Sequence, residues 1–117
     1  MTTAIQPEIT VEIEPLAARY LVESRSLEIE FNVGAVYRWP VDALEMRSYT
    51  SKGWVDAPRP TDEQLMNVEI WPHKEVVEFV DIEQCFEIAQ LMRGQLGSKK
   101  WMEKLLNQRQ SQNENRK

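Results

Sequence analysis

The fold is decided by residues 67–97, which read NVEIWPHKEVVEFVD and then IEQCFEIAQLMRGQLG. Short runs of β-branched and aromatic residues lie on either side of the turn Pro72–Glu75, and they predict the two strands of a hairpin. Asp81, with Gln84 three residues later, has the spacing of a capping box at the start of a helix. We therefore predict a hairpin that leads directly into an amphipathic helix over Ile82–Arg93.

The predicted helix has one apolar face, because its apolar residues recur at helical spacing. They are Ile82, Cys85, Phe86, Ala89, Met92 and Leu96. We expect Phe86 to be buried against the sheet and the helix to end at Gly94 or Gly97. Ser98 can cap a second, shorter helix, whose apolar face would comprise Trp101, Met102, Leu105 and Leu106.

The first half of the chain predicts another hairpin. Leu27–Phe31 alternates apolar and acidic residues, and Ala35–Trp39 reads as the returning strand. The connection Asn32–Gly34 contains Asn and Gly, which tolerate the positive φ angles of a short hairpin loop. Leu16–Val22 fits either a helix or a strand, and a strand from about Arg19 is favoured.

The remaining segments predict little regular structure. Ile9–Ile13 alternates apolar with polar residues, as in a half-buried strand, and Pro15 is expected to end it. Val41–Met46 suits one helical turn, whereas Arg47–Pro60 reads as a polar loop. Either residue of Thr61–Asp62 can cap a short turn before the next strand.

These elements predict an α+β fold. We expect a small antiparallel sheet of two hairpins, packed against one amphipathic helix and followed by a short C-terminal helix. The chain has 117 residues, which suits a single domain, and we place that domain at residues 1–107. Residues 108–117 contain no apolar side chain, and we expect them to form a disordered polar tail.

The sequence predicts no membrane span. Its apolar runs extend over only a few residues, far short of the ~20 that a crossing requires. Met1–Pro7 has neither the basic nor the apolar region of a secretory signal. Cys85 is the only cysteine and cannot form an intrachain disulfide, so we expect a cytoplasmic location.

The net charge of −5 is unevenly distributed along the chain. Residues 61–97 contain eight acidic and two basic residues, whereas residues 98–117 contain two acidic and six basic residues. An acidic body repels nucleic acids and anionic membranes. The basic C-terminal end can pair with the body itself, with an acidic partner or with phosphate.

The first hairpin resembles small bacterial proteins of the family called domain of unknown function 2442. That family shows an apolar–x–apolar–x–Phe strand, a turn with Asp or Asn and Gly, and a returning strand. The matching residues here are Leu27–Phe31, Asn32, Gly34 and Ala35–Trp39, and the acidic-apolar segment that follows is similar to Val41–Leu44.

The second half of the chain looks like a branch of that family associated with cyanobacteria, through the hairpin Val68–Phe79 and the predicted helix Cys85–Gly97. The resemblance covers roughly Arg19–Leu106. The chain departs from the pattern at Val33, which separates Asn32 from Gly34, and in the second turn, which lacks glycine. The resemblance implies a β-rich domain without known catalysis, and since some members accompany small toxin-like proteins, a partner-binding role.

No residue pattern in the chain predicts catalysis, a cofactor or a metal ion. His73 is the only histidine and lies in a predicted turn, where a solvated side chain is the favoured interpretation. Cys85 lies on an apolar stripe, and the nearby Glu83 and Glu87 would raise the pKa of its thiol. The glycines form no phosphate-binding loop. We therefore expect a protein that is not an enzyme.

Tryptophans and lysines provide the candidate partner-binding residues, since Trp is enriched at contact hot spots and lysines can steer an acidic partner. These candidates are Trp54, Lys52, Lys99, Lys100, Lys104 and Trp101. Trp54 would serve as an exposed anchor on a loop, or it would fold back onto the sheet. Trp101 fits a docked terminal helix as well as a binding surface.

The sequence thus predicts a non-enzymatic module that binds a protein partner, as a regulator, an assembly factor or an antitoxin-like protein. The alternative is a nucleic-acid-associated regulator that uses the basic C-terminal helix and tail. The acidic body favours the protein partner over nucleic acid.

Overall fold

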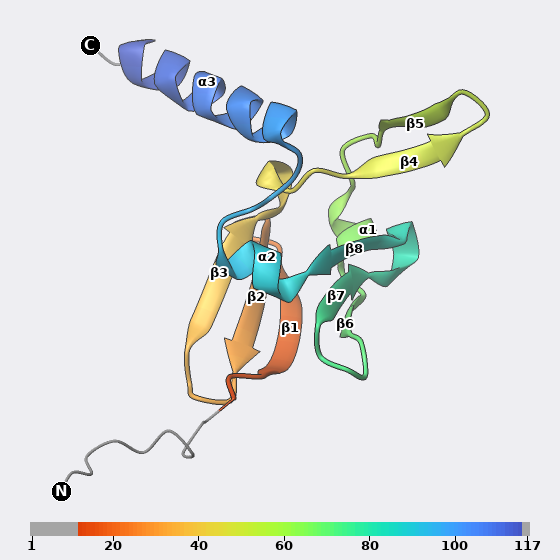
Figure 1. Cartoon of the computed structure of the whole chain (residues 1–117), viewed down its shortest axis with the longest axis vertical. Helices are drawn as coiled ribbons and strands as arrows, with labels where there is room; N and C mark the ends of the chain where they lie inside the picture. The colour runs from red at the N-terminus through yellow and green to blue at the C-terminus, as the bar shows by residue number, and fades with distance from the viewer. Residues whose placement is uncertain (1–11, 116–117) are drawn as a thin grey trace, which may run out of the picture.

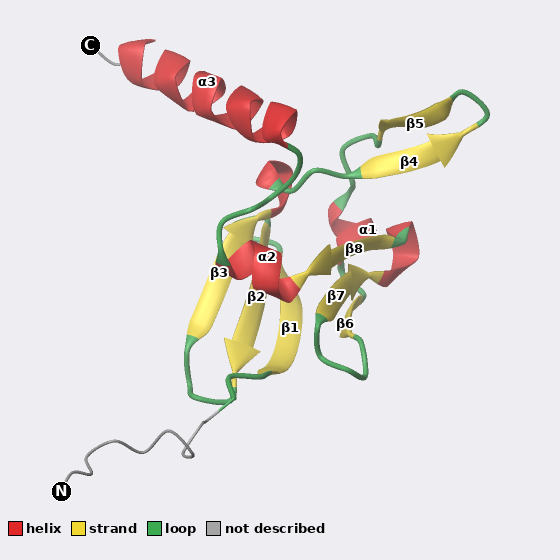
Figure 2. Cartoon of the chain, viewed as in Figure 1, coloured by secondary structure: helices red, strands yellow, loops and turns green. Residues whose placement is uncertain are grey.

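The computed structural model describes residues 12–115, with side chains described for residues 12–111. This part of the chain is α+β: eight strands form three small antiparallel sheets, and only one helix has seven or more residues. The strands make up the body, and the long helix projects from it at the C-terminal end (Figure 2). The α+β prediction is confirmed. The prediction of one sheet built from two hairpins is wrong, because the hairpins belong to separate sheets.

The first sheet contains the first predicted hairpin, which is confirmed. Its strands, with the second in the middle, are β1 (Pro15–Leu21), β2 (Ser26–Phe31) and β3 (Val36–Pro40). Gly34 turns the chain between β2 and β3 with a φ of 90°, which costs glycine little.

The segment Leu16–Val22, which fitted either a helix or a strand, is a strand as far as Leu21. Pro15 begins this strand rather than ending one, and the first position of a strand tolerates its missing donor. Residues 9–11 of the predicted N-terminal strand lie outside the described residues.

The second sheet is a hairpin where the sequence predicts a polar loop. Its strands are β4 (Arg47–Thr50) and β5 (Gly53–Asp56). Gly53 has a φ of 94°, and the Thr50 hydroxyl donates to the Gly53 carbonyl oxygen over 3.0 Å, so the tight turn is fixed locally. The 3₁₀ turn η1 (Val41–Ala43) precedes the hairpin, as predicted, and is followed by the buried Leu44.

A capping box forms at Thr61 and not at Asp81. The Thr61 hydroxyl accepts from the Gln64 backbone N–H, and the Gln64 side chain accepts from the Thr61 backbone N–H. Both interactions satisfy donors that a helix start leaves free. The short helix α1 (Asp62–Leu65) therefore begins at one of the predicted caps, and it buries Leu65 completely.

The third sheet contains the second predicted hairpin and an additional strand. Its strands are β6 (Val68–Ile70), β7 (Val76–Phe79) and β8 (Gln84–Glu87), with β7 in the middle. The helix predicted over Ile82–Arg93 is wrong. The chain instead passes through the 3₁₀ turn η2 (Val80–Ile82) and a left-handed Glu83 before β8 pairs with β7. Helix is limited to α2 (Ile88–Met92). Phe86 is partly buried on β8, and Glu87 is exposed.

The core lies between the first and third sheets, which adjoin where β1 runs beside β6 (Figure 1). The largest fully buried side chains are Phe79, Leu27, Ile29, Leu65, Leu91, Val41 and Val77. Trp39 is also buried, and its indole N–H donates to the Leu91 carbonyl oxygen over 3.0 Å. This bond joins the first sheet to α2 and satisfies the one polar group of the tryptophan.

The C-terminal helix α3 (Lys99–Asn115) projects away from the body (Figure 1). Its start is anchored, because the Trp101 indole N–H donates to the Ala43 carbonyl oxygen over 2.8 Å. The Ser98 hydroxyl accepts from the Trp101 backbone N–H, which confirms Ser98 as the cap. The helix is longer than predicted, since it continues past Asn107 through residues where the sequence predicts a disordered tail. The division into a domain at residues 1–107 and a tail stays a prediction.

Gly97, which lies just before α3, allows the chain to pass close to the body at this point. A Cβ atom at this position would lie 2.6 Å from the Glu45 Cβ atom and 2.6 Å from the Trp101 Cδ1 atom. The Glu45 backbone N–H also donates to the Leu96 carbonyl oxygen over 2.9 Å, so the chain has little freedom to move away. Only glycine fits between these neighbours.

Gly97→Ala is therefore expected to lower the free energy of unfolding by about 1–3 kcal/mol, as overpacking does elsewhere. Urea unfolding followed by circular dichroism measures this loss. The exposed neighbour Gln95 provides the control, and Gln95→Ala is expected to unfold like the wild type. Equal stability of Gly97→Ala and wild type would contradict this packing of the linker.

An ion-pair network fastens the chain before α1 to the first sheet. The Asp42 carboxylate accepts from Arg25 and from Arg59, in both cases over 2.9 Å. Arg25 also donates to the Pro60 carbonyl oxygen over 3.1 Å. The hydrogen bonds from Arg59 and then Arg25 hold the pKa of Asp42 well below its ordinary value.

The network predicts a loss of stability in acid. Because folding lowers the pKa of Asp42, its stabilisation is complete above the unfolded pKa of about 3.9 and is lost as the pH falls toward the lower folded value. We expect Asp42→Asn to be less stable than wild type at pH 7 and the difference to shrink below about pH 4. Urea unfolding at both pH values measures this, with Glu69→Gln on the exposed side of β6 as the control. A difference that stays constant with pH would refute the role of the carboxylate charge.

Candidate functional site

The β4–β5 hairpin presents two large aromatic rings to solvent. Tyr49 is 73% exposed and Trp54 is 61% exposed. The two residues are cross-strand partners, so their side chains lie on the same face, and their ring centroids are 5.3 Å apart in an edge-to-face arrangement. Figure 1 shows the hairpin projecting from the body, with its tip furthest out. The structure thus places Trp54 in solvent, and the alternative in which it folds back onto the sheet is wrong.

The base of the hairpin is fixed to the third sheet by one amide side chain. The Gln84 side chain accepts from the Arg47 backbone N–H over 3.3 Å and donates to the Arg47 carbonyl oxygen over 2.9 Å. The Ala57 backbone N–H donates to the Met46 carbonyl oxygen over 3.0 Å at the same end. A two-stranded hairpin is marginally stable by itself in water. These bonds therefore hold it at a defined position above β8.

A cavity of about 440 Å³ lies between the hairpin and the β8–α2 segment, and we call it the hairpin groove. Its apolar lining comes from Phe86, Leu91 and Leu96, with Trp54 contributing from the hairpin. The other lining residues are Glu45, Arg47, Glu83, Gln84, Cys85, Glu87, Gln90, Gln95 and Gly97. Three carboxylates against one guanidinium give this groove an acidic rim.

Cys85 lines the hairpin groove as an exposed free thiol. Its pKa is raised, first by partial burial and then by the negative charge of Glu78. A raised pKa keeps the thiol protonated, whereas a nucleophilic cysteine needs a lowered one. His73 lies in the turn between β6 and β7, where its Nδ1 atom accepts from the Glu75 backbone N–H over 3.2 Å. The two side chains therefore belong to different parts of the third sheet.

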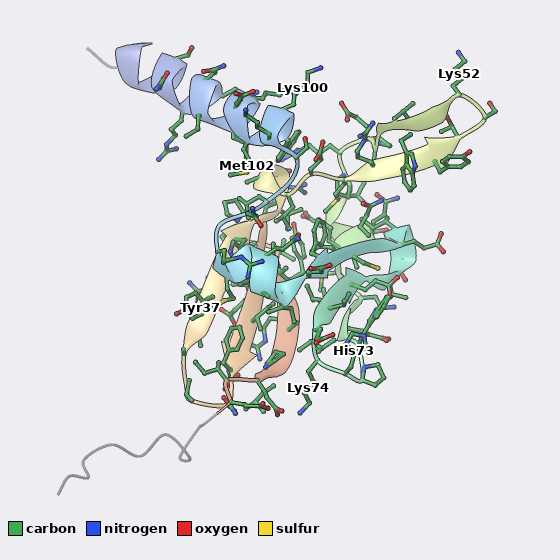
Figure 3. The ribbon with its side chains drawn as sticks, in the orientation of Figure 1. Tyr37, Lys52, His73, Lys74, Lys100 and Met102 are labelled. Atoms are coloured by element: carbon green, nitrogen blue, oxygen red, sulfur yellow. The ribbon has the colours of Figure 1, made fainter. Side chains whose placement is uncertain are left out.

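The other predicted binding residues lie on α3 and at the hairpin tip. Lys52 points into solvent from the tip, and Lys100 points into solvent from the first turn of α3 (Figure 3). Lys99 is also exposed. The Lys104 ammonium lies 5.4 Å from the centroid of the Trp101 ring, a cation–π contact. Trp101 itself is half-buried and anchors α3, so its packing role is structural.

The structure brings these residues together only in part. Lys100, Trp101 and Lys104 share a smaller cavity of about 280 Å³ with Arg47 and Asp56 at the base of the hairpin. Glu45 and Arg47 line both this cavity and the hairpin groove, so the two cavities adjoin at these residues. Trp54 contributes to the groove alone, and Lys52 and Lys99 line neither cavity.

Tyr49 and the residues of the groove floor were not among the binding residues predicted from the sequence. The signal for Tyr49 was present, because Tyr49 and Trp54 flank the short polar stretch Thr50–Gly53, which ends in glycine. Aromatic residues at both ends of such a turn are typical of a hairpin pair. No local sequence pattern indicates the groove floor, because Phe86 and Leu96 come to lie beside the hairpin only in the folded chain.

Two kinds of feature among the described residues would bear on function: side-chain clusters that could hold a metal ion, and helices that could span a membrane. Within residues 12–115, no group of three or more His, Cys, Asp or Glu side chains is arranged to hold a metal ion. Over the same range, none of the helices combines the length and apolarity that a membrane crossing requires.

The fold has a known structural relative, whose sequence is distant. A crystal structure of a protein of unknown function from Rhodospirillum rubrum ATCC 11170 matches with a TM-score of 0.61 and 22% identity. The match covers 79% of this chain and 99% of that protein. No family model matches the chain, and no curated protein matches it. The chain therefore shares its fold with an uncharacterised bacterial protein, and this similarity concerns the fold alone.

Proposed function

We propose that this protein is a non-enzymatic module that docks on a protein partner through the β4–β5 hairpin. One observation carries the proposal: Tyr49 and Trp54 form an exposed aromatic pair on a hairpin that projects from the body. Exposed aromatic rings of this size are costly in water, and Trp and Tyr dominate the energetics of protein interfaces. A hairpin that is fixed at its base presents them with little conformational entropy left to lose on binding.

The groove beside the hairpin supports the same function. Phe86, Leu91 and Leu96 offer an apolar floor, while Glu45, Glu83 and Glu87 form an acidic rim. An apolar centre with a polar rim is the usual arrangement of a protein interface. The chemistry fits a partner segment that carries apolar side chains flanked by basic ones.

A non-enzymatic role is supported by the setting of the two most reactive side chains. The thiol of Cys85 has a raised pKa, and His73 lies in a turn of the β6–β7 hairpin. Neither residue forms a nucleophile–base pair of the kind that covalent catalysis uses. We accordingly propose a regulator, an assembly factor or an antitoxin-like protein, and kinship with domain of unknown function 2442 through the β2–β3 hairpin.

Binding of nucleic acid is the second candidate function, and α3 favours it. Lys99, Lys100, Lys104 and Arg109 are exposed on this projecting helix. Phosphate contacts of this kind weaken steeply with salt. Fluorescence anisotropy with labelled single- and double-stranded DNA and RNA at low salt tests this role. We expect no binding that survives physiological salt, because the body is acidic.

Affinity capture tests the main proposal. Tagged wild type and tagged Trp54→Ala are used to recover proteins from the source organism, with Trp71→Ala as the matched control. Trp71 is 38% exposed and lies next to His73, at the far end of the body from the hairpin (Figure 3). We expect wild type and Trp71→Ala to recover the same protein and Trp54→Ala to lose it. Equal recovery by all three proteins would refute the proposal.

A further inference from the structure

Helix α3 has an apolar stripe that the body covers only in part, since Met102 and Leu105 are half-buried and Leu106 is exposed. Met102, Leu105 and Leu106 lie on one side of the helix, and Leu106 is 61% exposed. They line an open cavity of about 430 Å³, together with Pro40, Asp42 and Ala43 of the body and with Gln108 and Arg109 of the helix. A protein helix derives most of its stability from packing such a stripe. The stripe therefore needs a further apolar surface to pack against, in addition to the residues that anchor the start of the helix.

The charges beside the stripe indicate what covers it. Lys99 and Arg109 lie at helical spacing on the same side of α3 as Met102 and Leu106. They are basic, as is the whole C-terminal end, in which residues 98–117 have six basic and two acidic residues. The hairpin groove has the opposite character, with an apolar floor and the exposed carboxylates of Glu83 and Glu87 at its rim. One chain thus carries both halves of a complementary contact.

We propose that the hairpin groove of one copy binds helix α3 of a second copy, in a reciprocal dimer. The inference rests on the proposed docking role of the groove and names one occupant for it. Gly97 lines the groove and lies two residues before α3 begins, so each helix starts at the edge of the groove of its own copy. A twofold axis near this edge places each helix against the other copy's groove, and the contact is made twice.

Pairing of two α3 helices is the competing arrangement, and their charges oppose it. Lys99 and Arg109 flank the stripe and would meet the basic side chains of the other helix, with Glu103 as the one acidic side chain among residues 99–111. Like charges placed together at an interface cost affinity. The acidic groove removes this repulsion and supplies apolar floor residues for Met102 and Leu106.

Analytical ultracentrifugation of the purified full-length protein tests the dimer. We expect wild type to change from monomer to dimer with rising concentration, with a dimer that weakens as salt is added. Glu83→Lys with Glu87→Lys, and separately Lys99→Glu with Arg109→Glu, should each weaken the dimer by more than about tenfold. Near-ultraviolet circular dichroism verifies that both variants fold.

Mixing the two variants gives the most specific result. In a reciprocal dimer of unlike variants, each reversed groove meets a reversed helix, and each native groove meets a native helix. We expect the mixture to dimerise where neither variant does alone. A wild type that is monomeric at every accessible concentration would overturn the proposal, as would a dimer that survives both reversals or a mixture that stays monomeric.

The same measurements separate this inference from the proposed function. If wild type is monomeric but recovers a partner that the Trp54→Ala variant does not, the hairpin is a docking site and the dimer is rejected. If wild type dimerises through the groove but Trp54→Ala recovers every partner that wild type recovers, the dimer stands and the proposed function fails.

Discussion

Replacing Phe79 with alanine is expected to lower the free energy of unfolding by about 3–5 kcal/mol. Phe79 is fully buried on β7, the middle strand of the third sheet. Its ring meets that of Phe86 edge-on, with centroids 6.2 Å apart. The substitution removes the largest fully buried side chain and leaves a cavity where the first and third sheets adjoin. Since a small domain has a net stability of about 5–15 kcal/mol, the loss is a large fraction of the total.

Urea unfolding followed by tryptophan fluorescence measures this loss, and Phe86→Ala provides the comparison. Phe86 is only partly buried on the edge strand β8, so its removal should cost clearly less than that of Phe79. Phe79→Leu keeps most of the buried volume and should cost less still. If Phe86→Ala proves as destabilising as Phe79→Ala, the core is centred elsewhere than the structure places it.

Removing both aromatic rings of the hairpin is expected to abolish most of the partner affinity. Each interface hot spot contributes about 2 kcal/mol or more, so Tyr49→Ala combined with Trp54→Ala should weaken binding by at least about a hundredfold. The same double variant should melt close to the wild type, because both side chains are mostly exposed and little buried area is lost. Isothermal titration calorimetry with the purified partner measures the affinity.

The pattern of the two effects distinguishes a docking site from a structural role. Trp71→Ala, at the far end of the third sheet, should bind the partner with wild-type affinity. A double variant that melts much lower than the wild type and still binds would show that Tyr49 and Trp54 stabilise the hairpin rather than contact the partner.

Local sequence signals predicted the elements that local interactions determine. The β2–β3 hairpin follows from alternation over Leu27–Phe31 and from a glycine in the turn. The cap at Ser98 and the turn at Val41–Ala43 were likewise predicted correctly. Each of these elements depends mainly on interactions within one short stretch of the chain, so the pattern and the structure agree.

The predicted helix over Ile82–Arg93 failed because distant partners outweighed the local pattern. Apolar residues at positions 82, 85 and 86 fit a helical stripe, but Gln84–Glu87 pairs with β7 as a strand. Glu83 adopts a left-handed conformation, which a helix interior does not allow. The Gln84 side chain, expected to cap the helix, binds the backbone of Arg47 in the hairpin instead.

The candidate site was predicted in part, for the same physical reason. Trp54 was a candidate from the sequence, which left its exposure open, and the hairpin that holds it was read as a loop, because β4 and β5 contain few apolar residues. The groove floor depends on the contact between β8 and the hairpin base, which joins residues far apart in the sequence. Proximity of that kind has no signature in a single sequence.

Site-specific photocrosslinking tests the central claim most directly, because it reports which position touches the partner. The photoreactive residue p-benzoylphenylalanine replaces Trp54 in one variant and Tyr37 in another. Tyr37 is 45% exposed on β3, away from the hairpin (Figure 3). We predict a covalent adduct with the partner from position 54 and none from position 37. An adduct from position 37 without one from position 54 would contradict the assignment of the hairpin as the docking surface.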